Sequence, residues 1–163
     1  EEKNIMQKFL YEVGHDTGMI TYGEAEVRRL LEMGAVRLLL LSEDGVLAKA
    51  LIGPESKLDK EYLVRVTDQI TDKKLALLRH GLDLDGRKLK PANVTAIEPQ
   101  LLRFILNEGR KRQIRRMCEA VDLGVTDLLR VRIGPLSLGA LPEGKWRVLG
   151  ADEREALIRA SRG

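Results

Sequence analysis

The first 41 residues alternate between apolar and polar positions in patterns typical of both helices and strands. Apolar residues recur at helical spacing over 4–13 and again over 24–33, so two amphipathic helices are predicted. Short strands are predicted over 19–22 and 36–41, and the second is apolar enough to be buried on both faces. This part of the chain is therefore predicted to run helix, strand, helix, strand.

The rest of the chain predicts shorter elements without a regular alternation of strand and helix. Helices are predicted over 46–51, 71–79, 111–121 and 152–160. Strands are predicted over 62–66, 94–97, 102–106, 128–133 and 146–149, with a hairpin turn at Asp85-Gly86. These patterns indicate an α+β fold with a mixed, largely antiparallel sheet and flanking helices. We expect one merged domain in which 36–41 is a central strand.

Composition narrows the class of protein. The chain has 163 residues, of which 44% are hydrophobic and 33% charged, as in globular proteins. Its longest apolar stretch, 36–41, is far shorter than the roughly 20 residues of a membrane-spanning helix, so we expect a cytoplasmic protein. The single cysteine, Cys118, excludes an internal disulfide and a multi-thiolate zinc site, and with two histidines a histidine-rich metal site is also excluded.

Charge divides the chain into two parts of opposite sign. Residues 1–44 carry five Lys/Arg and nine Asp/Glu, a net charge of −4. The remaining residues carry 23 Lys/Arg and 16 Asp/Glu, a net charge of +7. A basic C-terminal part is typical of nucleic-acid binding, although a mildly basic solvated surface has the same composition.

The densest chemical signal is the segment 110–116, in which five of seven residues are basic. On a helix, one face of this region is apolar and holds Ile114, Met117, Cys118 and Val121. A different face holds Arg112, Arg115 and Arg116. A solvated helix face is one interpretation, but closely spaced cations repel one another and favour an anionic partner such as RNA. On the apolar face Cys118 is expected to be a core thiol and not a nucleophile.

Five blocks in order resemble a known family. They lie at 60–66, 90–94, 108–117, 130–136 and 144–147, and the third reads Glu-Gly-Arg-Lys-Arg-Gln-Ile-Arg-Arg-Met. Together they closely resemble the C-terminal part of bacterial ribosomal pseudouridine synthases of the small-subunit synthase A type. The resemblance covers roughly residues 38–160.

The resemblance implies isomerisation of a uridine in ribosomal RNA without metal or cofactor, with the base extruded from its stack. It implies that Tyr62 packs on the target base and that Arg115 pairs with the catalytic aspartate, which favours the ionised carboxylate. An ordinary strand aromatic is the other interpretation of Tyr62. The RNA-facing candidates that the resemblance implies are Lys60, Arg110, Lys111, Arg112, Arg116 and Arg132.

The sequence departs from this family before residue 38. No Gly-Arg-Leu-Asp motif stands in 24–37, and the family's N-terminal RNA-binding domain is not found in the sequence. Residues 1–44 instead resemble the start of the C-terminal domain of archaeal and eukaryotic peptide chain release factor subunit 1. The matching stretches are Phe9-Leu10-Tyr11-Glu12, Asp16-Thr17-Gly18, Tyr22-Gly23 and 31–36.

The two resemblances meet at 38–44, a strand and turn that suit both families. The simplest interpretation is an engineered chimera of a release-factor-like segment, 1–44, and a synthase-like segment, 45–163; a natural gene fusion is the alternative. The favoured hypothesis is a domain that retains a weak RNA-binding surface without catalysis. The other hypotheses are a synthase that uses Asp44 or Asp59 as a substitute carboxylate, and a protein-interaction module. An exposed strand edge would also allow pairing with a second copy.

Overall fold

The computed structural model describes residues 45–52, 57–108, 112–142, 145 and 147–162. The elements predicted within 1–41, including the central strand 36–41, lie outside the described residues. The chain divides into two compact units, one formed by 1–58 with 132–163 and the other by 59–131. These units differ from the predicted segments 1–44 and 45–163, whose boundary stays a prediction.

The unit formed by 59–131 is built on an antiparallel sheet. Its strands lie in the order β4 (Asn93–Glu98), β5 (Leu101–Leu106), β1 (Lys60–Val66), β6 (Val125–Ile133). β1 pairs with β5 from Lys60 opposite Leu106 to Arg65 opposite Leu101. Tyr62, Val64 and Val66 are all buried, as their alternation with more exposed residues predicts.

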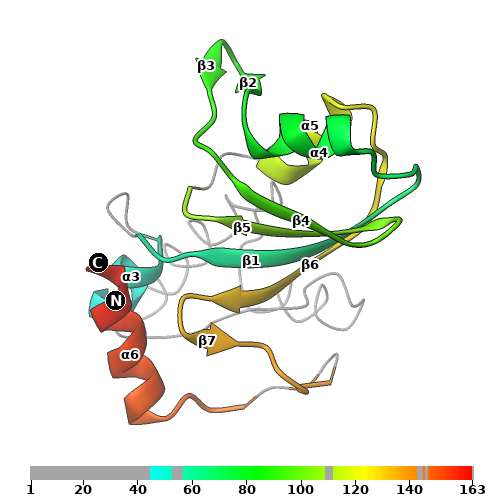
Figure 1. Cartoon of the computed structure of the whole chain (residues 1–163). Coiled ribbons are helices and arrows are strands. Elements are labelled where there is room, and N and C mark those ends of the chain that lie inside the picture. The colour runs from blue at the N-terminus through cyan, green and yellow to red at the C-terminus, as the bar shows by residue number, and fades with distance from the viewer. Residues whose placement is uncertain (1–44, 53–56, 109–111, 143–144, 146, 163) are drawn as a thin grey trace, which may run out of the picture. The chain divides into compact units, whose positions relative to one another are not determined.

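Two helices, α4 (Asp72–Arg79) and α5 (Gln113–Glu119), cover the same side of this sheet (Figure 1). Thr71 begins α4 by accepting a hydrogen bond from the Lys74 amide. A hairpin of β2 (Asp83–Leu84) and β3 (Arg87–Lys88) follows. The core between helices and sheet is apolar, and its most completely buried members are Val64, Leu78, Val94, Leu102, Phe104, Met117, Cys118 and Leu123.

Helix α4 also covers part of the sheet edge formed by β4. The Ala92 amide donates to the Arg79 carbonyl at 3.0 Å, and the Arg79 Nε donates to the Val94 carbonyl at 2.7 Å. Residues 92 and 94 are two apart, so these backbone groups point to the same side of the strand. Covering an edge strand in this way limits pairing with another chain. Only residues 95–98 of β4 lie beyond the carbonyl that Arg79 bonds.

In the other unit, helices α3 (Gly45–Ile52) and α6 (Ala151–Ser161) pack against each other. The last residues of β6 pair with β7 (Leu136–Ser137) through a turn at Gly134. Six buried side chains form a separate small core: Leu47, Leu51, Leu58, Ile133, Leu136 and Leu157. Both units therefore combine helices with antiparallel pairing, which confirms the predicted α+β class with flanking helices.

Most predicted elements within the described ranges are present, and three differ. The helix predicted over 111–121 is shorter, Gln113–Glu119, because Arg112 has a left-handed φ of 53° that a helix interior does not allow. The strand predicted over 128–133 begins earlier, at Val125. Residues 147–149 form no strand and lead into α6, where Glu153 accepts two hydrogen bonds from the Arg147 side chain.

None of the helices in the described ranges is long and apolar enough to cross a bilayer.

Candidate nucleic-acid interface

Helix α5 has the two faces that its sequence predicts. Ile114, Met117 and Cys118 are buried in the core, whereas Arg112 is exposed and Arg115 and Arg116 are half-buried. Cys118 is completely buried, which confirms its predicted core position, and burial raises the pKa of its thiol to about 12. The apolar face fixes the helix on the sheet and leaves the arginine side chains toward solvent.

The start of α5 is held by a buried polar contact. Gln113 is buried, and its Nε2 donates to the Glu108 Oε1 at 2.8 Å. The same oxygen accepts the backbone amide of Lys90 at 3.3 Å. One carboxylate therefore joins the first turn of the arginine helix to the segment that follows the β2–β3 hairpin.

The tip of the hairpin is attached to the same helix by an ion pair. The Asp85 carboxylate accepts two hydrogen bonds from Arg116, at 2.9 Å from Nη1 and 2.6 Å from Nη2. This is the paired geometry in which an arginine binds a carboxylate or a phosphate. The bond from Asp85 raises the pKa of Arg116 above its usual value, so the guanidinium stays charged.

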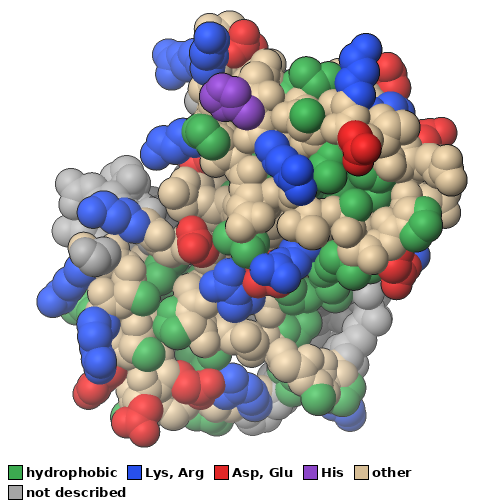
Figure 2. Space-filling view, viewed as in Figure 1, with side chains coloured by type: hydrophobic (Ala, Val, Ile, Leu, Met, Phe, Trp, Pro, Cys, Tyr) green, Lys and Arg blue, Asp and Glu red, His purple; other side chains and the backbone are tan. Residues whose placement is uncertain are grey.

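The hairpin adds basic residues that the sequence prediction missed. Arg87, Lys88 and Lys90 are all exposed. They are contributed by the run Arg-Lys-Leu-Lys directly after the Asp-Gly turn, and that run was the signal for a second basic element. Figure 2 shows Lys and Arg side chains projecting around this hairpin at the top of the view, with acidic side chains among them. Hairpin and α5 together form one basic surface, here called the hairpin–α5 surface.

The remaining predicted site residues lie apart from this surface or outside the described ranges. Tyr62 is only 8% exposed, stands opposite Phe104 on β5 and belongs to the core, so little of its ring faces solvent. Lys60 is half-buried two residues earlier on the same side of β1. Arg132 belongs to the other unit, where its Nη1 donates to the Gly134 carbonyl at 2.8 Å. Arg110 and Lys111 lie outside the described residues.

The structure gives Arg115 no carboxylate partner from the part of the chain that it describes. Asp59 is exposed at the start of β1, and Asp44 lies outside the described residues. Among the described residues, no group of three His, Cys, Asp or Glu side chains is placed to hold a metal ion. The half-buried Arg115 guanidinium is therefore available to an anion at this position.

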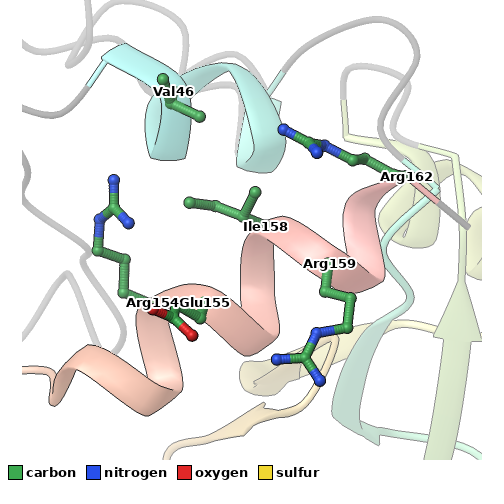
Figure 3. Close-up of a pocket in the computed structure, with 6 residues that line it drawn as sticks. All are labelled: Val46, Arg154, Glu155, Ile158, Arg159 and Arg162. Atoms are coloured by element: carbon green, nitrogen blue, oxygen red, sulfur yellow. The ribbon is translucent and has the colours of Figure 1, made fainter.

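A hollow lies between α3 and α6 (Figure 3). It has a volume of about 520 Å³ and is lined by Val46, Arg154, Glu155, Ile158, Arg159 and Arg162. Arg159 points away from Val46 in the close-up. Small-molecule sites are mostly apolar, and this hollow is lined mainly by charged side chains, so it does not match such a site.

A family model described as eRF1 domain 3 matches residues 1–122. The chain belongs to the eRF1 domain 3 family. This match extends beyond the predicted 1–44 segment, through β1 and α5.

The chain is also similar to pseudouridine synthases, in keeping with the resemblance predicted for residues 38–160. It is 35% identical over 134 residues to an uncharacterized RNA pseudouridine synthase of Aquifex aeolicus, a match of 80% of this chain and 54% of the relative. It is 39% identical over 125 residues to the ribosomal large subunit pseudouridine synthase B of Escherichia coli K12, covering 73% of this chain and 43% of the relative. The chain thus spans about half the length of these relatives.

A solved structure supports the same fold. A crystal structure of a pseudouridylate synthase superimposes with a TM-score of 0.66 and 31% identity, covering 71% of this chain and 52% of that one. The eRF1 domain 3 match and the synthase matches each take up most of this chain, so they overlap. Both resemblances are therefore present in one polypeptide.

Proposed function

We propose that this chain is a chimeric domain, derived from a ribosomal RNA pseudouridine synthase, that binds RNA weakly through the hairpin–α5 surface and does not isomerise uridine. The observation that carries this proposal is the group of three arginines formed by Arg115 and Arg116 on α5 and Arg112 directly before it, on a helix fixed to a synthase-like fold. Arginine forks suit phosphate oxygens, and phosphate contacts bind RNA without reading its sequence.

The chemistry of the fold supports the absence of turnover. Isomerisation in the synthase family requires an aspartate, and the stretch 24–37 contains no aspartate. Asp59 lies three residues before Tyr62, on the lead-in to β1, whereas the family's catalytic motif precedes the strand that corresponds to 38–41. Under this proposal Arg115 binds a backbone phosphate in place of the missing carboxylate, and Tyr62 serves the core. Losing the reacting group of a site removes most of its rate.

Salt dependence of RNA binding is the first test. Each phosphate neutralised on single-stranded RNA contributes about −0.7 to the slope of log affinity against log salt. We expect Arg112→Ala and Arg115→Ala each to reduce that slope by about this amount. Arg159→Ala is the matched control, because it removes one exposed arginine from α6 and is expected to leave the slope unchanged. Affinity that is insensitive to salt would show that this group of arginines is only a solvated helix face.

Pseudouridine formation is the second test. Ribosomal RNA transcripts incubated with the chain are expected to yield no pseudouridine above background in a tritium-release assay. Product formation that Asp59→Ala or Asp44→Ala abolishes would establish the alternative, a synthase with a substitute carboxylate. The assay thus separates RNA binding from catalysis.

The match of residues 1–122 to eRF1 domain 3 favours a second candidate function, a protein-interaction module. The release-factor domain that 1–44 resembles contacts a translational GTPase, so such a GTPase is the partner this candidate requires. Calorimetric titration of the chain with a purified release-factor GTPase tests it. Binding at micromolar concentration that survives Arg112→Ala and Arg115→Ala would favour the interaction module over the RNA-binding domain.

A further inference from the structure

The ion pair between Asp85 and Arg116 occupies a position that suits a phosphate. Both terminal nitrogens of Arg116 donate to the two carboxylate oxygens, at 2.9 and 2.6 Å. A phosphodiester offers the same pair of acceptor oxygens and the same single negative charge at neutral pH. The Asp85 side chain is 70% exposed and that of Arg116 32%, so a ligand from solvent has access to this pair.

The surroundings of the pair are strongly basic. Arg112 lies one helical turn before Arg116, and the Arg116 amide donates to the Arg112 carbonyl at 3.1 Å. Arg115 is its neighbour in α5, and Arg87 and Lys88 follow Asp85 in the hairpin. Asp85 thus places a carboxylate directly on a basic helix, where it lowers the attraction for a polyanion.

The backbone conformation of the hairpin turn places the Asp85 carboxylate next to α5. Asp85 has a φ of 56° and Gly86 a φ of 70°, the left-handed pair of a tight hairpin turn. Asparagine accepts that conformation as readily as aspartate. The charge of residue 85 can therefore be removed without changing the turn.

The geometry points to a phosphate-binding position at Arg116 that Asp85 fills in the free protein and that the RNA backbone takes over on binding. This inference rests on the proposed RNA-binding function and adds that Asp85 competes with RNA phosphate for Arg116. Surface ion pairs contribute little to stability, so the exchange of Asp85 for a phosphate is cheap. Once a phosphate occupies the fork, repulsion moves the hairpin tip away from α5. Asp85 is then a residue that sets RNA affinity.

Asp85→Asn tests the exchange. We expect this variant to bind single-stranded oligouridylate about two- to fivefold more tightly than the wild type at low salt, because Arg116 no longer has a charged competitor. The matched control is Asp83→Asn, which removes an exposed carboxylate from the same hairpin outside this pair. We expect it to change RNA affinity less than twofold, because a charge that does not contact the bound phosphate is largely screened by salt. In the Arg116→Ala background the gain from Asp85→Asn is expected to vanish.

A second probe separates failure of this inference from failure of the proposed function. Inorganic pyrophosphate is titrated into both proteins while the guanidinium resonance of Arg116 is followed by NMR, and the resonance is expected to respond at lower concentration in Asp85→Asn. RNA binding by the wild type that Asp85→Asn leaves equal or weakens would overturn the inference alone. A response of Arg116 to pyrophosphate in both proteins, at lower concentration in Asp85→Asn, without RNA binding by the wild type, would support the phosphate position and contradict the proposed function. A response only in Asp85→Asn would show that phosphate does not displace Asp85 and would overturn the inference. No response of Arg116 in either protein would overturn the inference.

Discussion

The Nε of Arg79, in the last turn of α4, donates a hydrogen bond of 2.7 Å to the carbonyl of Val94 on the edge strand β4. Together with the bond from the Ala92 amide to the Arg79 carbonyl, it joins helix and sheet edge at two points. We expect Arg79→Ala to lower the free energy of unfolding by about 1–2 kcal/mol, since a bond from a charged donor is lost. Urea denaturation of both proteins measures this difference in the free energy of unfolding. Lys73→Ala, an exposed position in the same helix, is the control and is expected to stay within about 0.5 kcal/mol.

The same variant tests whether α4 limits pairing of the chain with a second copy. Arg79→Ala frees the Val94 carbonyl, and an uncovered edge strand favours strand pairing between molecules. Sedimentation velocity is expected to show more self-association for Arg79→Ala than for the wild type or Lys73→Ala. Equal self-association in all three proteins would mean that the edge does not govern oligomeric state.

Two glycines with similar backbone conformations separate steric clash from backbone strain. Gly134 and Gly139 have φ values of +52° and +60°, so alanine is strained at either position. A Cβ at 134 would lie 2.6 Å from the Cδ2 of the buried Leu58, whereas a Cβ at 139 meets nothing within 4 Å. Gly139→Ala is expected to cost about 1 kcal/mol and Gly134→Ala about 2–4 kcal/mol. Equal losses in thermal or urea unfolding would show that Leu58 moves aside freely.

The start of α6 is expected to lose stability in acid. The Arg147 guanidinium donates to Glu153 at 2.8 and 2.7 Å, and it lowers the pKa of that carboxyl to about 2, with a smaller contribution from the Gly150 amide. The pKa in the folded chain is below the unfolded value of 4.5, so the stabilisation is complete above pH 4.5 and is lost as the pH falls toward 2. Urea unfolding across this range is expected to bring wild type and Glu153→Gln together at the acid end. A constant difference between the two proteins would contradict the assignment.

Cys118 provides a label for unfolding because it is the only cysteine in the chain. Its thiol is completely buried and burial raises its pKa to about 12, so little thiolate forms at neutral pH. Iodoacetamide is expected to modify the protein at pH 8 only in denaturing urea, as followed by mass spectrometry. Rapid labelling of the native protein would mean that α5 leaves the sheet readily.

Local patterns in the sequence predicted the elements whose partners are close in the chain. The alternation in β1 correctly predicted the buried positions Tyr62 and Val64, and the helical spacing in α5 predicted its apolar face. The pairing of Asp85 with Arg116 spans 31 residues, so no local pattern contains it.

The prediction of a strand over 146–149 was wrong. Residues 147–149 instead lead into α6, and the Arg147 side chain has its partner six residues later, at the start of that helix. The left-handed conformation of Arg112 was equally unpredictable, because arginine has no preference for it. Predictions therefore succeeded where hydrophobic burial decides the structure. They failed where a backbone conformation unusual for its residue or a specific side-chain contact is involved.

The antiparallel arrangement of β1 and β6 bears on where two parent genes could be recombined. The Thr67 amide donates to the Gly124 carbonyl, and the Thr126 hydroxyl donates to the Arg65 carbonyl, so the two strands run in opposite directions. The unit 59–131 thus enters and leaves through neighbouring antiparallel strands, and its two ends emerge side by side. A segment with adjacent ends can be transferred into a host as a single insert, closed by any connection that spans one strand spacing, about 5 Å. Recombination at 59 and 131 would preserve every strand pair of this unit, whereas a junction at 38–44 lies outside it altogether.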